Sequence, residues 1–419
     1  MERQIGNRLP VLRGKDIPDI VWGVCLFLLM LAVICFGGSD AGANYYYYFT
    51  FFLFFGYSLL LYFFRNREAL RLYLPVHFAW YGIFILLAVA SGIWADSLEY
   101  SFVPLSKMVQ ILATTYCLIL YIDSEETMER YIRAVIAATL FMIVFIFVRT
   151  PSAEWFSGFL GIVTRYNTND VGCALSIGVI FAFYEAYVRG RKLYYAVVAV
   201  AFFTAILTSS RKALFMCVLG ILIMVVFNYR ARNYMLRVLI ALAGLALAVL
   251  LIYQIPYLYQ TVGVRIDKMI EFVMTDRASN RNTDSSLALR SYYIDMAKSY
   301  FEESPLFGIG MNNFTYRIHD YGVRLSYAHN NYMEIAADLG IIGLIMYYWF
   351  YIYLLLKLAK HVLNGKKNAL PYFAMMILLL IFEYGMVNYY KMQVHLVIAV
   401  GYAVSVMHDR ADRFGGQTE

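Results

Sequence analysis

A histidine, two amides and two carboxylates open a long apolar run, at His329, Asn330, Asn331, Glu334 and Asp338. Asn330, Glu334 and Asp338 are four residues apart, so in a helix they share one face. Gly340 and Gly343 lie just beyond them, and small residues at this spacing are expected to let another helix approach closely. Ionisable groups at the edge of a membrane span are costly and mark candidate functional sites. The start of a helix favours the neutral imidazole, which can accept a proton from a hydroxyl group. The alternative is a histidine that only caps the helix.

A second candidate site is Arg211, which follows Thr208, Ser209 and Ser210 between two apolar runs. Ser209 or Ser210 can cap the helix that begins at Arg211, which leaves free N–H groups beside the guanidinium. A helix N-terminus with an arginine is well suited to bind phosphate. The alternative is a positive charge that reaches toward lipid headgroups.

Two further polar segments carry arginines. Arg165 and Asn169 precede the apolar run that starts at residue 170, where the alternative is an ordinary loop and helix cap. Arg290 lies in a predicted helix at about 286–302, where the alternative is a surface ion pair with Asp295 or Glu302. No Asp-rich metal motif, Walker motif or Gly-rich nucleotide loop accompanies these residues. A site rich in arginine without metal ligands suits a lipid-linked diphosphate.

The elements that position these residues are membrane helices. The chain has 419 residues, of which 62% are hydrophobic and 15% charged, against about 25% charged in a typical soluble domain. Apolar runs of about 20 residues recur along its length, and each is long enough to cross a bilayer. We expect one all-α polytopic integral membrane domain over residues 1–419. The predicted spans are 17–37, 43–64, 73–94, 102–122, 131–149, 170–188, 193–208, 211–228, 236–253, 331–357, 369–387 and 391–407.

The distribution of Lys and Arg predicts how the chain is oriented. With the N-terminus in the cytoplasm, basic residues collect in the inside segments, and the first two outside loops have none. This positive-inside pattern predicts cytoplasmic termini and accounts for the net charge of +7 without nucleic acid. Residues 1–16 are polar and basic, and the first span is expected to be an uncleaved anchor. His329, Arg211, Arg165 and Arg290 would all lie on the extracytoplasmic side.

Residues 254–327 form one long extracytoplasmic loop with balanced charge. A loop of this length without structure is improbable unless it is functional. Asp284 or Ser285 can cap the predicted helix at 286–302, and Pro305 and Gly308 would end it. We expect this helix to lie over the outer membrane face as a lid.

The motifs together resemble those of one bacterial family, the O-antigen polymerase and O-antigen ligase superfamily. His329-Asn330, nine residues and Gly340-x-x-Gly343 resembles its signature, and residues 207–213 resemble its T-x-S-R-x-A turn. Arg290 followed by residues 304–314 is similar to its P-L-x-G-x-G-x-x-x-F stretch after a helical arginine. Arg165-x-x-x-Asn169 resembles the loop before a mid-chain span. The resemblance covers about residues 160–345.

The resemblance implies a metal-independent, inverting glycosyltransferase with a glycosyltransferase-C-like fold and no cofactor. Its donor would be a glycan on undecaprenyl diphosphate at the outer face of the bacterial cytoplasmic membrane. His329 would be the base or would position the acceptor, with Glu334 as the other candidate base. Arg211, Arg290 and Arg165 would hold the donor diphosphate, and Asn330 and Asn169 would position the glycan acceptor.

The motifs leave more than one activity open. A polymerase joins lipid-linked repeat units, whereas a ligase moves finished glycan to lipid A core or protein, and we favour the polymerase. The third alternative is a flippase or other transporter, but such proteins place polar residues at mid-membrane and show two related halves. The expected partners are the lipid-linked donor, the glycan acceptor and membrane lipids, with a flippase and chain-length regulator proteins as candidates.

Overall fold

The computed structural model describes residues 17–35, 45–65, 74–155, 160, 168–228, 233–264, 266–267, 270, 285–320 and 326–415. This part of the chain is all-helical. Its main helices are α1 (Ile17–Cys35), α2 (Tyr45–Arg65), α3 (Val76–Ala90), α4 (Leu98–Phe102), α5 (Leu105–Tyr121), α6 (Glu125–Arg149), α7 (Thr168–Phe183), α8 (Tyr194–Leu207), α9 (Arg211–Phe227), α10 (Tyr234–Gln254), α11 (Pro256–Leu258), α13 (Ser285–Glu303), α14 (Asn313–Asp320), α15 (Asn331–Leu363), α16 (Leu370–Phe382) and α17 (Met392–Gly415).

The helices form a multi-pass membrane protein. Eight helical segments in the described residues are long and apolar enough to cross a bilayer, and two shorter apolar helices accompany them. Each of the twelve predicted ranges contains a helix, although a count of twelve crossings remains a prediction. Several predicted bounds were wrong: α6 begins earlier, at Glu125, and α15 and α17 end later, at Leu363 and Gly415. The run predicted at 369–387 stops being helical at Phe382. The residues that follow, 383–391, form a non-helical segment before α17.

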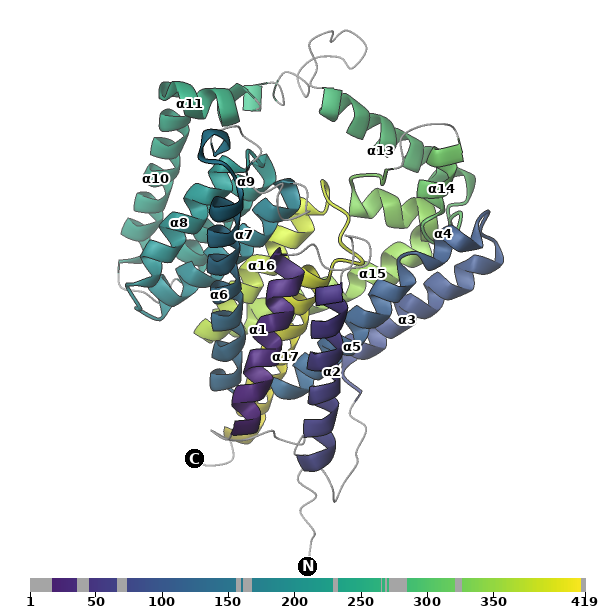
Figure 1. Ribbon diagram of the computed structural model, residues 1–419, viewed down its shortest axis with the longest axis horizontal. Coiled ribbons are helices and arrows are strands. Elements are labelled where there is room, and N and C mark those ends of the chain that lie inside the picture. The colour runs from purple at the N-terminus through teal and green to yellow at the C-terminus, as the bar shows by residue number, and fades with distance from the viewer. Residues whose placement is uncertain are drawn as a thin grey trace, which may run out of the picture.

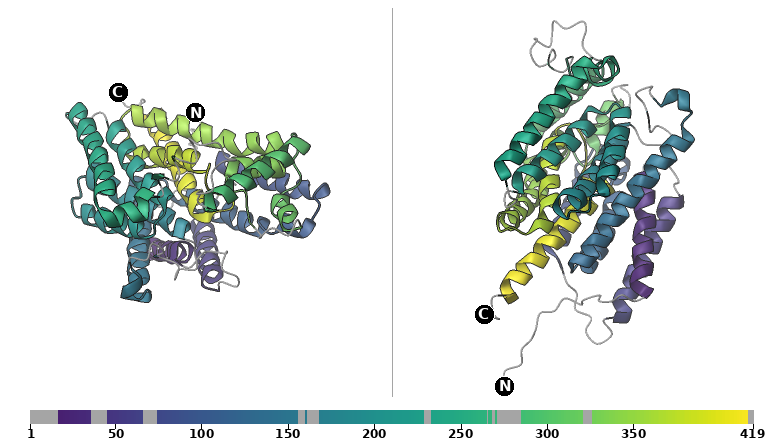
Figure 2. Two further views of the ribbon diagram at one scale, coloured as in Figure 1. Left: turned by 90° about the horizontal axis from the view of Figure 1, so that it is seen from above. Right: turned by 90° about the vertical axis from the view of Figure 1, so that its left-hand side faces the viewer.

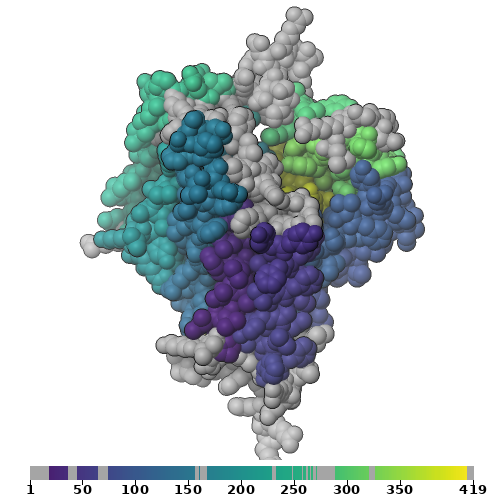
Figure 3. Space-filling view, in the orientation of Figure 1, coloured from purple at the N-terminus to yellow at the C-terminus, as the bar shows by residue number. Residues whose placement is uncertain are grey.

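The two ends of the bundle differ. Figure 1 shows α11, α13 and α14 at the upper end, which we call the loop end, and the last turns of α17 at the lower end, which we call the terminal end. The long yellow-green α15 crosses much of the width of the molecule when it is seen from above (Figure 2, left). At the loop end, C-terminal residues in yellow are visible between the α10–α11 side and the α13–α14 side (Figure 3).

α7 lies at the centre of one half of the bundle, packed against α6, α8 and α9. Its residues from Val171 to Phe183 are all buried. A Cβ on Gly172 would lie 2.6 Å from the Cβ of Ala213, so this glycine lets the first turns of α7 and α9 meet. Asn169 and Arg211 are therefore brought to one place by close helix packing.

α15 has a sharp kink at Gly340, where φ is 65° and ψ is −163°. The carbonyls of Ala337 and Asp338 accept hydrogen bonds from the N–H groups of Ile309 (2.9 Å) and Gly310 (2.8 Å). The N–H groups of Ile341 and Ile342, the helical partners of those carbonyls, donate instead to the carbonyls of Pro305 (2.9 Å) and Leu306 (3.4 Å). Residues 305–310 thus replace the helical hydrogen bonds that the kink removes.

The glycine spacing suggests that a second helix approaches α15 at Gly340, but a loop approaches there instead. Small residues at this spacing usually admit a second helix. Here a Cβ on Gly340 would lie 2.3 Å from the carbonyl oxygen of Leu306, which belongs to a loop, and a Cβ on Gly343 would meet Leu339 of its own helix. The expectation of a helix–helix contact was therefore wrong.

The helix predicted at 286–302 is present as α13, and it packs against α15. Its buried residues Tyr293, Ala297 and Tyr300 join a small apolar core with Phe314 and Ala337. Of the two predicted capping residues, Asp284 lies outside the described residues, as does the side chain of Ser285. The position of α13 at the loop end agrees with a lid, and that role remains a prediction.

Charged side chains also fix the far end of α13. Arg317 of α14 pairs with Glu303 and with Asp96, both at 2.6 Å, and its guanidinium lies over the Tyr300 ring at 5.0 Å. These hydrogen bonds raise the pKa of Arg317 despite partial burial. α13 is thus held at its C-terminal end by ion pairs and along one face by apolar packing.

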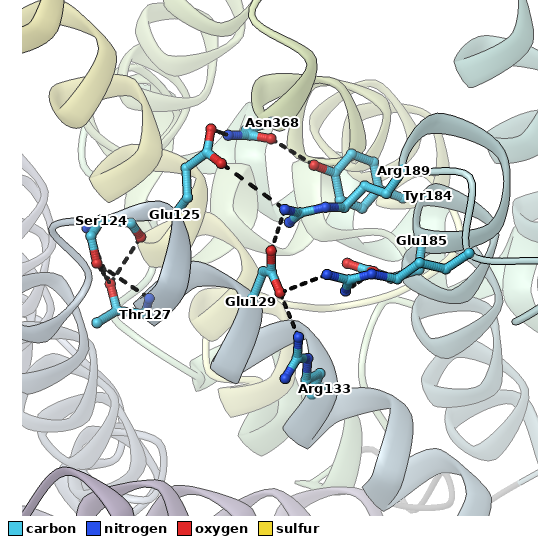
Figure 4. Close-up of polar contacts among 10 residues, drawn as sticks. Ser124, Glu125, Thr127, Glu129, Arg133, Tyr184, Glu185, Arg189 and Asn368 are labelled. Atoms are coloured by element: carbon cyan, nitrogen blue, oxygen red, sulfur yellow. Dashed lines mark hydrogen bonds and ion pairs between the residues drawn. The ribbon is translucent and has the colours of Figure 1, made fainter. Parts of the chain in front are cut away.

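A separate charged cluster ties helices together at the terminal end (Figure 4). Glu129 of α6 contacts Arg133 at 2.6 Å, Arg191 at 3.1 Å and also Arg189. Glu185, in the π-helix η5 (Tyr184–Val188), is fully buried and pairs with Arg191 at 2.5 Å. A paired buried carboxylate is tolerated, whereas an isolated one is not. This cluster fastens the terminal ends of α6 and α7.

We predict that Gly340→Ala will destabilise the protein by about 3 kcal/mol or more, because alanine is strained at this φ and its Cβ would overlap the Leu306 carbonyl. Thermal unfolding in detergent would measure the loss. Gly244→Ala on α10 is the control, since nothing lies within 4 Å of its Cβ. Equal unfolding temperatures for the two variants would contradict the structural role of Gly340.

Candidate functional site

His329 directly precedes the cap of α15 and has an unusual backbone, with φ of 55°. Asn330 is the cap, and its side-chain oxygen accepts from the Met333 N–H at 3.1 Å. The carboxylate of Glu334 accepts from the Ala328 N–H at 2.7 Å. Residues on both sides of His329 are therefore fixed, which holds it in a left-handed conformation.

The imidazole of His329 lies among aromatic rings and beside two cations. Its ring centroid is 4.1 Å from that of Tyr327 and 6.0 Å from that of Tyr293 on α13. Burial, together with the charges of Arg290 and Lys212, lowers the pKa of His329 to about 3. The ring is neutral at pH 7 as the sequence indicates, and burial and these two cations are causes that the sequence did not show.

The first turn of α9 has the predicted cap. Ser210 accepts from the Ala213 N–H at 3.4 Å, and its hydroxyl donates to the Asn169 side-chain oxygen at 3.0 Å. Asn169 and Arg211 are thus joined through Ser210 at the meeting point of α7 and α9. Arg165 lies outside the described residues.

Lys212 is a site residue that the sequence did not single out. Its ammonium donates to the Gly385 carbonyl in the segment between α16 and α17. The charges of Arg211 and Arg290 both act on Lys212. The only signal in the sequence was its place next to Arg211, and a lysine there is indistinguishable from one that reaches toward lipid.

The two carboxylates of α15 hold backbone groups. Glu334 and Asp338 are each only 1% exposed. Asp338 accepts from the N–H groups of Asn312 at 2.7 Å and Phe314 at 2.9 Å, which satisfies free donors at the start of α14. Both carboxylates therefore fix the loops that surround His329, and neither points to open solvent.

The site is the meeting point of several helix starts. Asn169 and Asp170 come from α7, Arg211 and Lys212 from α9, Tyr327 and His329 from the residues before α15, Lys391 from the residue before α17, and Arg290 from α13. Tyr327, Asp170 and Lys391 were not predicted. Burial raises the pKa of Tyr327 to about 12, and Asp170, Lys391 and Arg290 all act on it. Helix N-termini carry partial positive charge, so the cations and the helices together favour an anion here.

Within the described residues, no group of three or more His, Cys, Asp or Glu side chains is arranged to hold a metal ion. The charged groups that act on His329 and Tyr327 include the cations of Arg290, Lys212 and Lys391 and the carboxyl groups of Asp170 and Glu334. Cations and helix starts suit phosphate oxygens.

Comparison with known proteins gives a match to a protein family. Residues 196–348 match a family model described as O-antigen ligase. The matched segment runs from α8 into α15 and includes Arg211, Arg290 and His329. No curated protein and no solved structure matches the chain.

We predict that His329 makes the folded protein less stable as the pH falls. Its folded pKa of about 3 lies below its ordinary value of 6.5, so below about pH 6.5 the unfolded chain binds the proton more readily. The unfolding temperature of the wild type should therefore fall more between pH 7.5 and 5 than that of His329→Asn. Asparagine is chosen because it tolerates the left-handed backbone. Identical losses in the two proteins would show that the imidazole titrates normally.

Proposed function

We propose that this chain, whose residues 196–348 match a family model described as O-antigen ligase, is a polysaccharide polymerase of the O-antigen polymerase and ligase superfamily. It would transfer glycan from undecaprenyl diphosphate to a sugar hydroxyl in O-antigen, capsule or exopolysaccharide synthesis. The observation that carries the proposal is a neutral imidazole, His329, placed beside Arg290 and Lys212 where several helices start.

The donor chemistry requires an anion site more than a strong acid. A diphosphate is already a good leaving group, so the protein must orient it and stabilise its developing charge. Arg211 and Arg290 would contact the diphosphate oxygens, and fixed cations in a partly buried site do this without reorganisation. We propose that Arg165 joins them and that the reaction needs no metal ion.

The acceptor chemistry requires one proton to be removed. In a single displacement, the acceptor oxygen bonds to the anomeric carbon, its proton passes to His329, and the bond from that carbon to the diphosphate oxygen breaks. The electron pair of that bond leaves with the diphosphate. Attack opposite the leaving group inverts the anomeric carbon. A base that is neutral before the reaction is suited to take the proton.

His329 is a better candidate for the base than Glu334. Glu334 is buried and engaged with the Ala328 N–H, so its carboxylate serves the backbone next to His329. The Asn330 side-chain oxygen is engaged in the helix cap, which leaves its amide group to position an acceptor. Asn169 would act through Ser210 at the start of α9. We therefore assign proton removal to His329 and a positioning role to Glu334.

The location follows from the same proposal. The protein would lie in the bacterial cytoplasmic membrane with its termini inside and the loop end outside, where the lipid-linked donor is presented. The Lys and Arg distribution supports this orientation. A flippase that delivers the donor and a protein that regulates chain length would be its partners.

A ligase is the second candidate, since the family description names that activity. It would use the same donor site, with lipid A core or protein as the acceptor. A transporter is less favoured, because the ionisable cluster around His329 gathers at helix starts and not halfway along the helices.

We predict that His329→Ala and Arg211→Ala will each abolish long glycan in cells, because one removes the base and the other a diphosphate contact. Chain-length ladders on gels, with the protein quantified in membranes, would measure this. His319→Ala, at an exposed position on α14, is the matched control and should give normal ladders. Normal ladders from either site variant would refute the assigned site.

Purified protein with labelled lipid-linked repeat units should form a ladder of products without any other protein, and chelator should not reduce the yield. Product that appears only after lipid A core is added would indicate a ligase. Movement of the lipid across liposomes without new glycosidic bonds would indicate a transporter. Loss of activity with chelator, restored by a divalent ion, would contradict the metal-independent mechanism.

A further inference from the structure

Residues 383–391, between α16 and α17, form an irregular segment beside the site, and Glu383 and residues 387–389 of this segment are buried. The carboxylate of Glu383 accepts from the hydroxyls of Tyr348 (2.6 Å) and Tyr351 (2.9 Å) and from the Asn331 amide (3.0 Å). The Asn331 side-chain oxygen in turn accepts from the N–H groups of Asn388 (2.8 Å) and Tyr389 (3.2 Å). Asn331 at the start of α15, together with Tyr348 and Tyr351 beyond the kink of the same helix, thus holds both ends of the segment.

The other side of the segment is held from α9 and α3. Lys212 donates to the Gly385 carbonyl, and the Tyr81 hydroxyl donates to the Tyr389 carbonyl at 2.6 Å. A satisfied polar network in a low-dielectric interior is rigid. The segment therefore delivers its last residue, Lys391, to a fixed place.

The Lys391 ammonium lies beside a carboxylate and an aromatic ring. The Lys391 ammonium lies 4.0 Å from the Asp170 carboxylate, a separation longer than a hydrogen bond, and 5.6 Å from the Tyr390 ring centroid. The Lys391 and Asp170 side chains are 19% and 21% exposed, so an incoming anion can reach them.

We propose that Lys391 is a further residue that binds the diphosphate of the lipid-linked donor, and that phosphate oxygen displaces Asp170 from it. The inference rests on the proposed function and adds a ligand from outside the segment that matches the family model, which ends at residue 348. Asp170 holds Lys391 near the site while the donor is absent.

Charge and side-chain flexibility support the replacement of Asp170 by a phosphate oxygen at Lys391. A diphosphate carries more negative charge than one carboxylate, so Lys391 gains Coulomb energy when it changes partner. A lysine ammonium on a flexible stem can move to a phosphate without a fixed fork geometry. Both Asp170 and Lys391 act electrostatically on Tyr327, whose ring contacts that of His329, so the pair lies beside the reacting groups.

Binding of undecaprenyl diphosphate to the purified full-length protein tests the inference without turnover. We expect Lys391→Gln to raise the Kd about tenfold, Lys391→Arg to stay within about threefold of the wild type, and Asp170→Asn to leave the Kd unchanged or lower it. Lys298→Gln, an exposed α13 lysine, is the control. Unfolding temperatures of all variants would show that each is folded.

The two substitutions are expected to change the Kd in opposite directions, which distinguishes a lysine that binds the diphosphate from one that only forms an ion pair with Asp170. If Lys391 served only to pair with Asp170, removal of either partner would weaken binding equally, and that result would overturn the inference. Wild-type affinity in Lys391→Gln would overturn it as well while leaving the proposed function intact. If the wild type does not bind undecaprenyl diphosphate, both the proposed function and this inference fail.

Discussion

Backbone hydrogen-bonding groups inside a membrane protein must find partners within the protein, and α15 breaks its own hydrogen bonds at Gly340. Residues 305–310 supply the replacement partners on both sides of the break. This exchange fixes the loop to the helix, and the loop in turn connects α13 to α14. Because α13 carries Arg290 and the first turns of α15 carry the residues that hold His329, the break sets the geometry of the site.

Ionisable side chains divide into those that hold the backbone and those that we propose to face the reacting groups. Glu334, Asp338 and Glu383 are buried and accept hydrogen bonds from backbone N–H groups, tyrosine hydroxyls or amides. A buried carboxylate is stable only with such donors. The imidazole of His329 and the cations of α9 and α13 are the groups that we propose take part in the reaction. The acidic groups that the sequence placed on one face with Asn330 thus form the support of the site.

Several parts of this arrangement could be predicted from the sequence because they depend on local patterns. The serine cap before Arg211, the helix at 286–302 and the position of His329 just before a helix were each predicted and are present. The contact at Gly340 was predicted with the wrong partner, because spacing shows that something approaches closely and does not show what. Lys212 and Lys391 could not be distinguished from lysines that reach toward lipid.

The sequence by itself determined an all-helical membrane protein and the residues whose chemistry suits a diphosphate donor and a hydroxyl acceptor, since hydropathy and residue type are local properties. Only the tertiary structure decided which of these residues meet. The first turns of α7, α9, α15 and α17 come together through contacts between residues more than forty positions apart in the chain, such as Ser210 with Asn169 and Lys212 with Gly385. It also decided that His329 is neutral through burial and neighbouring cations, because burial depends on packing between helices that no local pattern encodes.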